Sequence, residues 1–351
     1  MRLAFLTATP LNVRQGSGTY AGVSALASAL RDLGIEIEVF SPRLRAPIFT
    51  VRRLIFNEQL RSRQWEGFDA LVGFDMDGYR LAGRSGRPQV ASLKGVIADE
   101  MRFERGVTRL TMSIQAACEA RHARRADLVV TTSAYAARRI QELYGISTPP
   151  VIVPELIDLD AWRALFAANP AEPDPGRFTV LSVCRFYPRK RLHLLLEAAA
   201  RLRDGIPQLQ VRIVGDGPEW RRLQTLWRRL RLQDTVHWLG NLSQDELARE
   251  YNRCDLFCLP SVQEGFGIVF LEAMAAGKPI VAARAGAVPE VVEQGQLVEP
   301  ESAEALADGI LRLYRDPSLR DSLRSAGLSV AEGYRAPRVA EMFLTRVRSL
   351  L

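Results

Sequence analysis

The sequence has few of the residues that form covalent cross-links and metal sites, with four cysteines and three histidines among 351 residues. The cysteines (Cys118, Cys184, Cys254 and Cys258) are scattered without a paired metal-ligand spacing, so we expect reduced, buried thiols and neither disulfides nor a zinc site. No apolar run approaches the roughly 20 residues that cross a bilayer. The first residues, MRLAFLTATP, lack a charged leader before a long apolar core and are typical of a buried β-strand. These absences favour a protein of the cytoplasm.

The composition indicates a globular chain. Hydrophobic residues make up 47% and charged residues 25%, without low-complexity segments or a short repeat. A chain of 351 residues exceeds one core of ordinary size, so we expect two domains and a cleft between them. The net charge of +7 favours anionic ligands, a class that includes phosphates, acidic lipids and nucleic acid.

The densest basic stretch runs from Arg43 to Arg63, where six arginines interleave with apolar residues. This pattern is typical of an amphipathic segment that rests on an anionic membrane surface or binds an anionic acceptor. An ordinary helix whose arginine stems cover apolar neighbours has the same pattern. The first interpretation would place the protein peripherally on the inner face of the membrane.

Strand and helix signals alternate along the chain, with a first helix predicted at about 19–33. Residues 169–177, NPAEPDPGR, contain three prolines and a glycine and predict a linker. We therefore expect an N-terminal domain at 1–168 and a C-terminal domain at 178–335, with a final helix at about 336–351 that packs back on the first. Both should be α/β, Rossmann-like and doubly wound, with ligands bound at the carboxyl ends of the strands.

The most informative segment is PSVQEGFGIVFLE, which joins a predicted strand to a predicted helix. Glu264 and Glu272 bracket it. Gly265 and Gly267 allow a ligand to approach the backbone. A phosphate is expected at the free N–H groups of the helix N-terminus, which are those of Phe266, Gly267 and Ile268. Glu272 should lie about one helical turn farther along, roughly 6 Å away, where a carboxylate can accept from both hydroxyls of a ribose. A simpler interpretation is a helix cap followed by a solvated glutamate.

This segment resembles glycosyltransferase family 4, whose GT-B fold has two Rossmann-like domains facing a central cleft and whose signature is a glutamate pair at this spacing. The resemblance implies that Glu272 holds the ribose and that Glu264 contacts the donor sugar. The segment LSVCRFYPRKRLHLLLEA is similar to the family's strand, basic loop and helix. It implies that Arg185 and Lys190 clamp the diphosphate, whose developing negative charge needs fixed cations when no metal is present.

Two glycine pairs extend the resemblance. Gly215 and Gly217 are expected to form the turn beside the nucleotide base. Gly16 and Gly18 match the family's first glycine loop, which faces the donor phosphates. The second pair also fits a Gly-x-Gly-x-x-Ala nicotinamide motif, but Ser41 follows the second strand where an acid would be expected.

The chain departs from the family near the scissile bond, where Lys94 in SLKG replaces the histidine of many members. We therefore assign no histidine base. Lys94 is a candidate for contact with the donor sugar, a phosphate or an anionic acceptor, with an ordinary surface lysine as the alternative. Asp99 is a candidate for orienting an acceptor hydroxyl. Ser133 is a candidate contact that is also well placed to cap a helix ending at Gly145.

Asp75, Met76 and Asp77 form an Asp-x-Asp sequence, which metal-dependent glycosyltransferases of another fold use to bind a metal. Without the rest of that fold we favour an acceptor-side loop or turn. We expect no metal or other cofactor.

The resemblance thus predicts a retaining transferase that moves a sugar from a UDP-sugar or GDP-sugar to an acceptor hydroxyl by front-face attack. The acceptor is unidentified, with a lipid-linked one among the candidates, and no nucleic-acid partner is expected. Two alternatives remain open: a nucleotide-sugar epimerase on the same fold, and a non-catalytic sugar-nucleotide-binding subunit.

Overall fold

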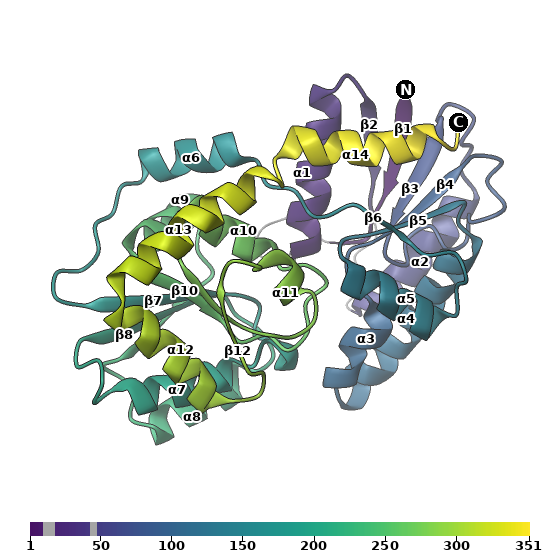
Figure 1. Ribbon diagram of the computed structural model, residues 1–351. Coiled ribbons are helices and arrows are strands. Elements are labelled where there is room, and N and C mark those ends of the chain that lie inside the picture. Colours follow the sequence, from purple (N-terminus) through teal and green to yellow (C-terminus); the bar gives the residue numbers. More distant parts are fainter. Residues whose placement is uncertain (10–17, 43–47) are drawn as a thin grey trace. The chain divides into compact units, whose positions relative to one another are not determined.

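The computed structural model describes residues 1–9, 18–42 and 48–351, which form two compact units. The first unit comprises Met1–Leu156 and Ala336–Leu351, and the second comprises Ile157–Arg335. Each contains one six-stranded sheet whose paired strands run parallel (Figure 1). The predicted class, α/β with two Rossmann-like doubly wound domains, is confirmed. Gly16 of the predicted glycine loop, and Arg43 and Arg45 of the basic stretch, lie outside the described residues.

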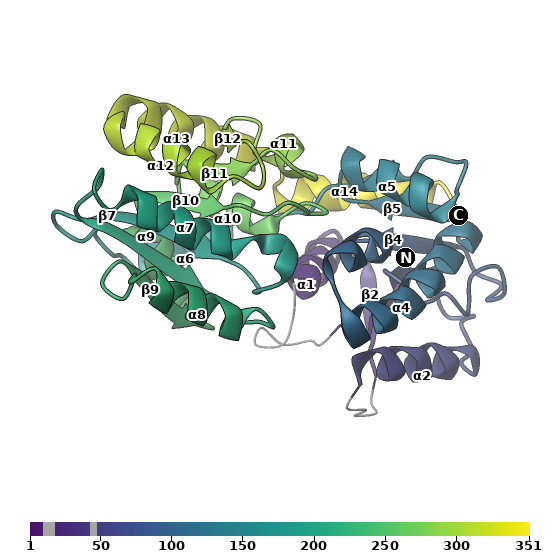
Figure 2. The same cartoon turned by 90° about the horizontal axis from the view of Figure 1, so that it is seen from below.

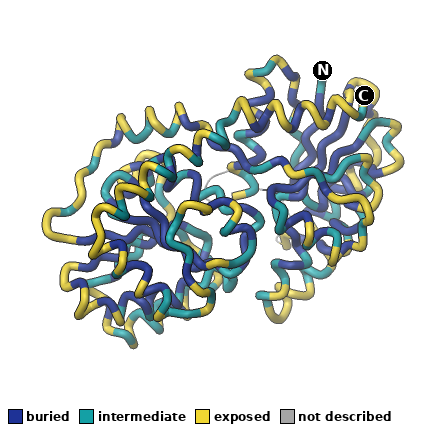
Figure 3. The backbone as a smooth tube through the Cα atoms, viewed as in Figure 1, coloured by how far each residue is buried: buried dark blue, intermediate teal, exposed yellow. Residues whose placement is uncertain are grey.

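The first sheet is buried on both faces (Figure 3), because its inner strands are nearly continuous apolar runs whose successive side chains point to opposite faces. Leu3 and Phe5 of β1 (Arg2–Leu6) face one set of helices, α1 (Gly18–Asp32) and α14 (Ala336–Arg348). The opposite face is covered by α2 (Phe49–Arg61), α4 (Gly106–Arg125) and α5 (Ala134–Tyr144). Across the sheet the strands are β2 (Glu36–Phe40), β1 (Arg2–Leu6), β3 (Ala70–Phe74), β4 (Gln89–Leu93), β5 (Leu128–Thr131) and β6 (Val151–Ile152).

The second sheet is covered in the same way. Its central strand directs Val180 towards α7 (Leu192–Leu202), α8 (Trp220–Arg229) and α12 (Ala303–Arg315). Leu181 points to the opposite face, which is covered by α6 (Leu159–Ala168), α9 (Gln244–Arg253), α10 (Ile268–Ala275) and the end of α13 (Pro317–Glu332). Across the sheet the strands are β12 (Gln296–Val298), β11 (Ile280–Ala283), β10 (Leu256–Leu259), β7 (Phe178–Val183), β8 (Leu209–Val214) and β9 (Val236–Gly240).

The predicted domain boundary at residue 168 is wrong, because α6 belongs to the second unit. Trp162 and Phe166 of α6 pack edge-to-face against Tyr251 of α9. The side chain of Asn169 donates a hydrogen bond to Asp245, 3.0 Å away. The proline-containing segment 169–177 therefore lies within the second unit and is not the link between the two. The chain leaves the first unit after Leu156 and returns at Ala336, where α14 packs on α1.

A buried ion pair anchors the loop that follows β3. Asp77 is fully buried and accepts hydrogen bonds from Arg53 Nη2 at 3.0 Å and from Asn57 Nδ2 at 3.0 Å. It also accepts from the backbone N–H of Ala8, just after β1, at 2.6 Å. From β1 the chain proceeds to one edge of the sheet, and from β3 to the other. The pair therefore ties together the two loops at the switch point of the first sheet.

This network gives physical roles to residues that the sequence placed at the surface or in a loop. Asp75, Met76 and Asp77 lie in a turn, as favoured, and the Asp77 carboxylate is occupied by Arg53. Arg53, expected within a basic surface stretch, is 4% exposed and cannot contact a membrane from this position. Among the described arginines of the stretch, Arg52 is partly exposed, and Arg61 and Arg63 are exposed. No helix in the described part of the chain is both long enough and apolar enough to cross a bilayer.

Replacing Asp77 with Ala should lower the free energy of unfolding of the first unit by about 3–5 kcal/mol, because it leaves Arg53 as a buried cation without its main partner. The measurement is urea denaturation, with the two units analysed as separate transitions where they resolve. Glu58→Ala is the control, since Glu58 forms an ion pair with Arg61 whose side chains are 51% and 48% exposed. That change should cost less than about 0.5 kcal/mol. Equal losses in the two variants would contradict the assignment.

Candidate functional site

The predicted site residues of the second unit gather at the carboxyl edge of its sheet, between β7 and β10. The chain proceeds from β7 towards one edge and from β10 towards the other, which makes this the switch point where such sheets bind ligands. The loops after these two strands are joined by a hydrogen bond from the backbone N–H of Val262 to the carbonyl of Arg189, 3.0 Å long. Residues far apart in sequence are thereby held at one place.

Lys190 and Glu264 form the central contact of this site. Lys190 Nζ lies 2.5 Å from Glu264 Oε1, and the two side chains are only 12% and 8% exposed. Burial acts to raise the pKa of Glu264, but the charges of Lys190 and Arg189 hold that pKa below its usual value. The site therefore presents an ionised carboxylate at neutral pH.

Arg185 differs from Lys190 because its guanidinium makes no ion pair or hydrogen bond with any residue that the structure describes. Arg185 is partly exposed in the loop after β7. A guanidinium presents several donors in a fixed planar arrangement that matches phosphate oxygens. Arg185 thus supplies a cation whose donors are available to an anionic ligand.

The glycines Gly215 and Gly217, predicted to form a turn beside a base, are required by the packing of two loops. A Cβ at Gly215, where φ is 123°, would lie 1.9 Å from the carbonyl oxygen of Cys184. A Cβ at Gly217 would lie 2.6 Å from the backbone N of Phe186. The loop after β8 can therefore lie directly against the loop after β7, which brings it beside Arg185.

The glycine-containing loop before α10 shapes the other side of the site. Gly267 precedes the helix with φ of 92°, a left-handed conformation that favours glycine. The first backbone N–H groups of α10, beginning at Ile268, have no intrahelical acceptors and carry the positive end of the helix dipole. Phe266 is buried and packs edge-to-face on Tyr334, so its side chain anchors this loop.

Glu272 lies one turn into α10 and is partly buried, unlike the solvated glutamate of the simpler interpretation. Its Oε2 accepts a hydrogen bond from the hydroxyl of Tyr251 at 2.9 Å. Burial raises the pKa of Glu272 to about 7. The carboxylate therefore changes charge near neutral pH, and only its ionised form can accept hydrogen bonds with both oxygens.

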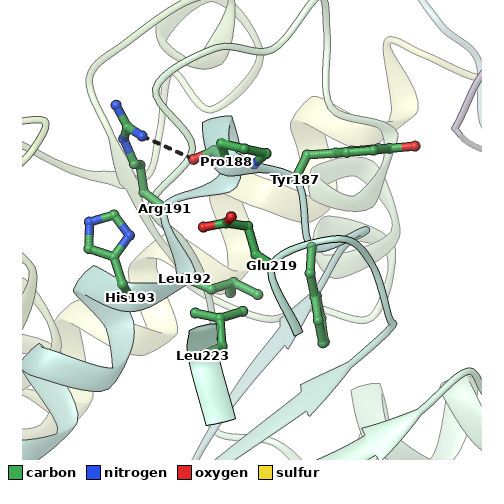
Figure 4. Close-up of a pocket in the computed structure, with 8 residues that line it drawn as sticks. Tyr187, Pro188, Arg191, Leu192, His193, Glu219 and Leu223 are labelled. Atoms are coloured by element: carbon green, nitrogen blue, oxygen red, sulfur yellow. Dashed lines mark hydrogen bonds between the residues drawn. The ribbon is translucent and has the colours of Figure 1, made fainter. Parts of the chain in front are cut away.

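A hollow lies beside these loops, at the start of α7. Figure 4 shows Tyr187, Pro188 and Arg191 along one side and Glu219, from the loop after β8, on the other. Arg191 donates to the carbonyl of Pro188 at 3.2 Å and also pairs with Glu301. His193 also lines this hollow, and burial followed by the charge of Arg222 lowers its pKa.

Of the candidates in the first unit, Lys94 and Asp99 are both engaged in ion pairs. Lys94 Nζ lies 3.0 Å from Glu155 Oε2, and each side chain is 7% exposed, so Lys94 is not an ordinary surface lysine. A Cβ at Gly22 of α1 would lie 2.4 Å from the Glu155 carboxylate, so α1 lies close to that side chain. Asp99 is fully buried and accepts from Tyr135, Arg102 and Arg139.

The remaining candidates of the first unit have structural positions. Ser133 caps α5 by accepting from the backbone N–H of Ala136 at 3.0 Å, and Gly145 ends that helix with φ of 62°, both as predicted. Gly18 is the first residue of α1 and is exposed. His122 is buried, and burial lowers its pKa to about 4, so it is neutral. Within the described ranges, no three His, Cys, Asp or Glu side chains form a metal-ligand set.

Sequence reasoning missed three residues that shape this site. Arg189 stands in the basic loop RFYPRKR, where charge alone does not show which cation faces Glu264. Gly286 stands in the loop after β11, and a Cβ there would meet the backbone N of Glu264 at 2.9 Å. No sequence pattern distinguished Tyr251, because the residues of its helix form an ordinary amphipathic pattern.

Comparison with known proteins agrees with this arrangement. Residues 167–329 match the family described as glycosyl transferases group 1. A GDP-mannose-dependent alpha-(1-6)-phosphatidylinositol monomannoside mannosyltransferase of Mycobacterium tuberculosis is 30% identical over 57% of this chain and 56% of its own, so the chain spans about half the length of that relative.

Two solved structures share the fold over nearly the whole chain. Sucrose-phosphate synthase from Thermosynechococcus elongatus has a TM-score of 0.83 at 22% identity and covers 99% of this chain and 98% of its own. Anabaena Alr3699/HepE in complex with UDP-glucose has a TM-score of 0.74 at 21% identity and covers 100% of both chains. The likeness to these two establishes a common GT-B architecture.

Lys190→Met and Arg185→Met should differ sharply in stability. Loss of Lys190 leaves Glu264 buried without its partner and should cost on the order of 3 kcal/mol at pH 8. The cost should shrink at pH 5, because the pKa of Glu264 rises once Lys190 is absent and the carboxylate then takes up a proton in the folded state. Arg185→Met should change stability by less than about 0.5 kcal/mol at either pH. Urea denaturation at the two pH values is the measurement, and a pH-independent loss for Lys190→Met would contradict the pairing.

Proposed function

Since residues 167–329 belong to the glycosyl transferases group 1 family, we propose that the protein is a retaining glycosyltransferase that moves a sugar from a nucleoside diphosphate to an acceptor hydroxyl. The observation that carries the proposal is the grouping of Arg185, the Lys190–Glu264 pair and the N-terminus of α10 at the switch point of the second sheet. These groups are the cations and backbone donors that a departing diphosphate requires.

In the proposed complex the diphosphate lies between Arg185, Lys190 and the first N–H groups of α10. Glu272 accepts from the ribose hydroxyls, and Glu264 contacts the sugar. The loop containing Gly215 and Gly217 lies beside the base. A UDP-sugar and a GDP-sugar are both candidate donors, since the HepE structure contains UDP-glucose and the mycobacterial relative is GDP-mannose-dependent.

The proposed reaction is front-face displacement. The acceptor oxygen bonds to the anomeric carbon from the side on which the diphosphate leaves, while the bond from that carbon to the diphosphate oxygen breaks. The acceptor proton passes to a diphosphate oxygen. Arg185 and Lys190 stabilise the negative charge of the leaving group, a role that a metal ion performs in other enzymes.

The alternatives predict different products from a labelled sugar nucleotide. A transferase delivers the sugar to an acceptor or to water, an epimerase returns an altered donor, and a binding subunit returns the donor unchanged. The relatives reported above are a transferase and a synthase by name, and they give the epimerase alternative no support. A thermal-shift screen with UDP, GDP, ADP and TDP would identify the base, because a ligand that binds only the folded state raises the melting temperature.

Arg185→Ala should reduce the rate of nucleoside diphosphate release from UDP-glucose or GDP-mannose, whichever is the donor, by about two to three orders of magnitude, as loss of a charge-stabilising donor does. Arg201→Ala is the matched control, since Arg201 is exposed in the last turn of α7, and its rate should be unchanged. Full activity in Arg185→Ala, or activity that becomes dependent on added magnesium, would overturn the proposed role.

We further propose a lipid-linked acceptor and a peripheral membrane contact. The proposed contact surface lies mainly on α4, outside the predicted stretch from Arg43 to Arg63. On α4, three apolar side chains at positions i, i+3 and i+7 are exposed, Val107 by 76%, Leu110 by 64% and Ile114 by 44%. Beside them, on α2, Val51 is 42% exposed. The two helices are joined by a 2.8 Å hydrogen bond from Gln115 to Thr50 and are neighbours in Figure 2.

Two exposed basic residues, Arg105 just before α4 and Arg109 within it, flank this apolar row. Apolar insertion combined with basic residues is the pattern by which helices bind anionic lipid surfaces. The relative from Mycobacterium tuberculosis is named for a phosphatidylinositol acceptor, which supports the choice of a lipid. Arg53, in contrast, has no part in this surface.

The protein should sediment with phosphatidylglycerol-containing vesicles, less so as salt rises, and not with phosphatidylcholine alone. Arg105→Glu with Arg109→Glu should lower vesicle affinity at least thirtyfold, since each basic residue near the surface contributes about 1 kcal/mol. Val107→Ser with Leu110→Ser should lower it as well. Arg346→Glu with Arg348→Glu, an equal change on exposed residues of α14, is the control. No sedimentation of the parent protein at low salt, or equal losses in test and control, would overturn the membrane contact.

A further inference from the structure

The Glu272 carboxylate is held by one side chain. Tyr251 donates to Oε2 at 2.9 Å, and no other described side chain donates a hydrogen bond to Glu272. The second oxygen, Oε1, is therefore left for a ligand. The backbone around the pair is regular, since Tyr251 lies in α9 and Glu272 in α10. A single hydrogen bond thus sets how this carboxylate is oriented on its helix.

Tyr251 is itself fixed. It is fully buried, and its ring packs edge-to-face on Trp162 at 6.0 Å and on Phe166 at 6.3 Å. The ring of Phe257, on β10, lies 6.1 Å away. Aromatic neighbours on three sides restrict rotation of the ring, so the hydroxyl can point in few directions. Tyr251 is accordingly a rigid donor.

We infer that Tyr251 is a positioning residue for donor binding, which orients Glu272 so that its free oxygen accepts from the ribose of the sugar nucleotide. The inference rests on the proposed function, because it needs a nucleotide at this site. Its physical basis is preorganisation: a carboxylate held before the ligand arrives loses less conformational entropy on binding. Tyr251 does not touch the ligand and acts through Glu272.

Tyr251 should also set the pH at which Glu272 becomes ionised. Burial raises the pKa of Glu272 to about 7, and the hydrogen bond from Tyr251 opposes this rise by favouring the charged form. Loss of the hydroxyl therefore shifts the pKa of Glu272 further upward.

Charged groups on the other elements near α10 are engaged elsewhere and do not contribute to this pKa. Lys278, just after α10, donates to the carbonyls of Asn252 and Cys254. Arg163 of α6 pairs with Glu332 of α13, and Asp160 with Arg335. Arg324 of α13 packs its side chain beside Gly277.

The test is isothermal titration calorimetry of the 351-residue chain with UDP-glucose and with GDP-mannose between pH 6 and pH 9. These donors are diphosphate diesters and carry no phosphate proton that titrates near neutral pH. Ionisation of the ligand therefore does not mask the titration of Glu272. In the parent, affinity should rise with pH through about 7, because only ionised Glu272 accepts from both ribose hydroxyls. In Tyr251→Phe, affinity at pH 7 should fall about tenfold and its midpoint should move to higher pH. In a Glu272→Gln background the effect of Tyr251→Phe should disappear.

Tyr144→Phe is the matched control. Tyr144 is a second buried tyrosine that donates to a buried glutamate, Glu119, but it lies in the first unit. Its affinity and pH profile should equal those of the parent.

The outcomes separate the inference from the function on which it rests. Absence of binding by the parent to either donor overturns the proposed function and the inference with it. Parent binding with an unchanged Tyr251→Phe overturns the inference alone, as does a loss of equal size at every pH, which indicates a merely structural tyrosine. If Tyr251→Phe does not fold, the parent still provides a test, because affinity that does not change between pH 6 and pH 8 excludes the proposed titration.

Discussion

Where the chain leaves two neighbouring parallel strands in opposite directions, the loops that follow diverge and must be held in place by contacts other than the sheet. Both sheets of this protein use a buried cation and carboxylate for this purpose. In the first, Arg53 and Asp77 join the ends of β1 and β3. In the second, Lys190 and Glu264 join the loops after β7 and β10. Most other features of the two edges are arranged around these pairs.

The two pairs differ in what else they can do. Asp77 receives hydrogen bonds from three groups and has no capacity for a ligand, so its pair only holds the loops. Lys190 and Glu264 are slightly exposed. Arg185, without an ion-pair partner among the described residues, lies in the loop after β7, and the N-terminus of α10 follows the loop after β10. The same electrostatic device is therefore structural in one unit and suited to ligand binding in the other. The neighbouring cations hold the pKa of the buried Glu264 carboxylate below its usual value, which burial alone would raise.

Much of this could be predicted from local sequence. The first helix was expected at 19–33 and runs from Gly18 to Asp32, and the cap and stop residues of α5 are those predicted, because both depend on neighbouring residues alone. Contacts between distant residues were not accessible. The pattern of α2 shows several arginines on an amphipathic helix but not that Arg53 is the one that meets Asp77. Likewise, the sequence suggested that the glycines of the site face a ligand. In the structure, Gly215 is needed because the loop after β7 lies directly against it. The domain boundary predicted at residue 168 was misplaced, because prolines indicate an irregular segment. They do not indicate which unit that segment packs against.

The divided first unit has a consequence for biosynthesis. Its apolar face over α1 is completed by Val339, Phe343 and Val347 of α14, which follow the whole second unit in the chain. Translation therefore delivers the closing piece of the first unit last. Until then the first unit lacks the helix that covers this face, and the uncovered apolar side chains are a natural binding surface for chaperones. The unit whose synthesis begins first is thus completed last.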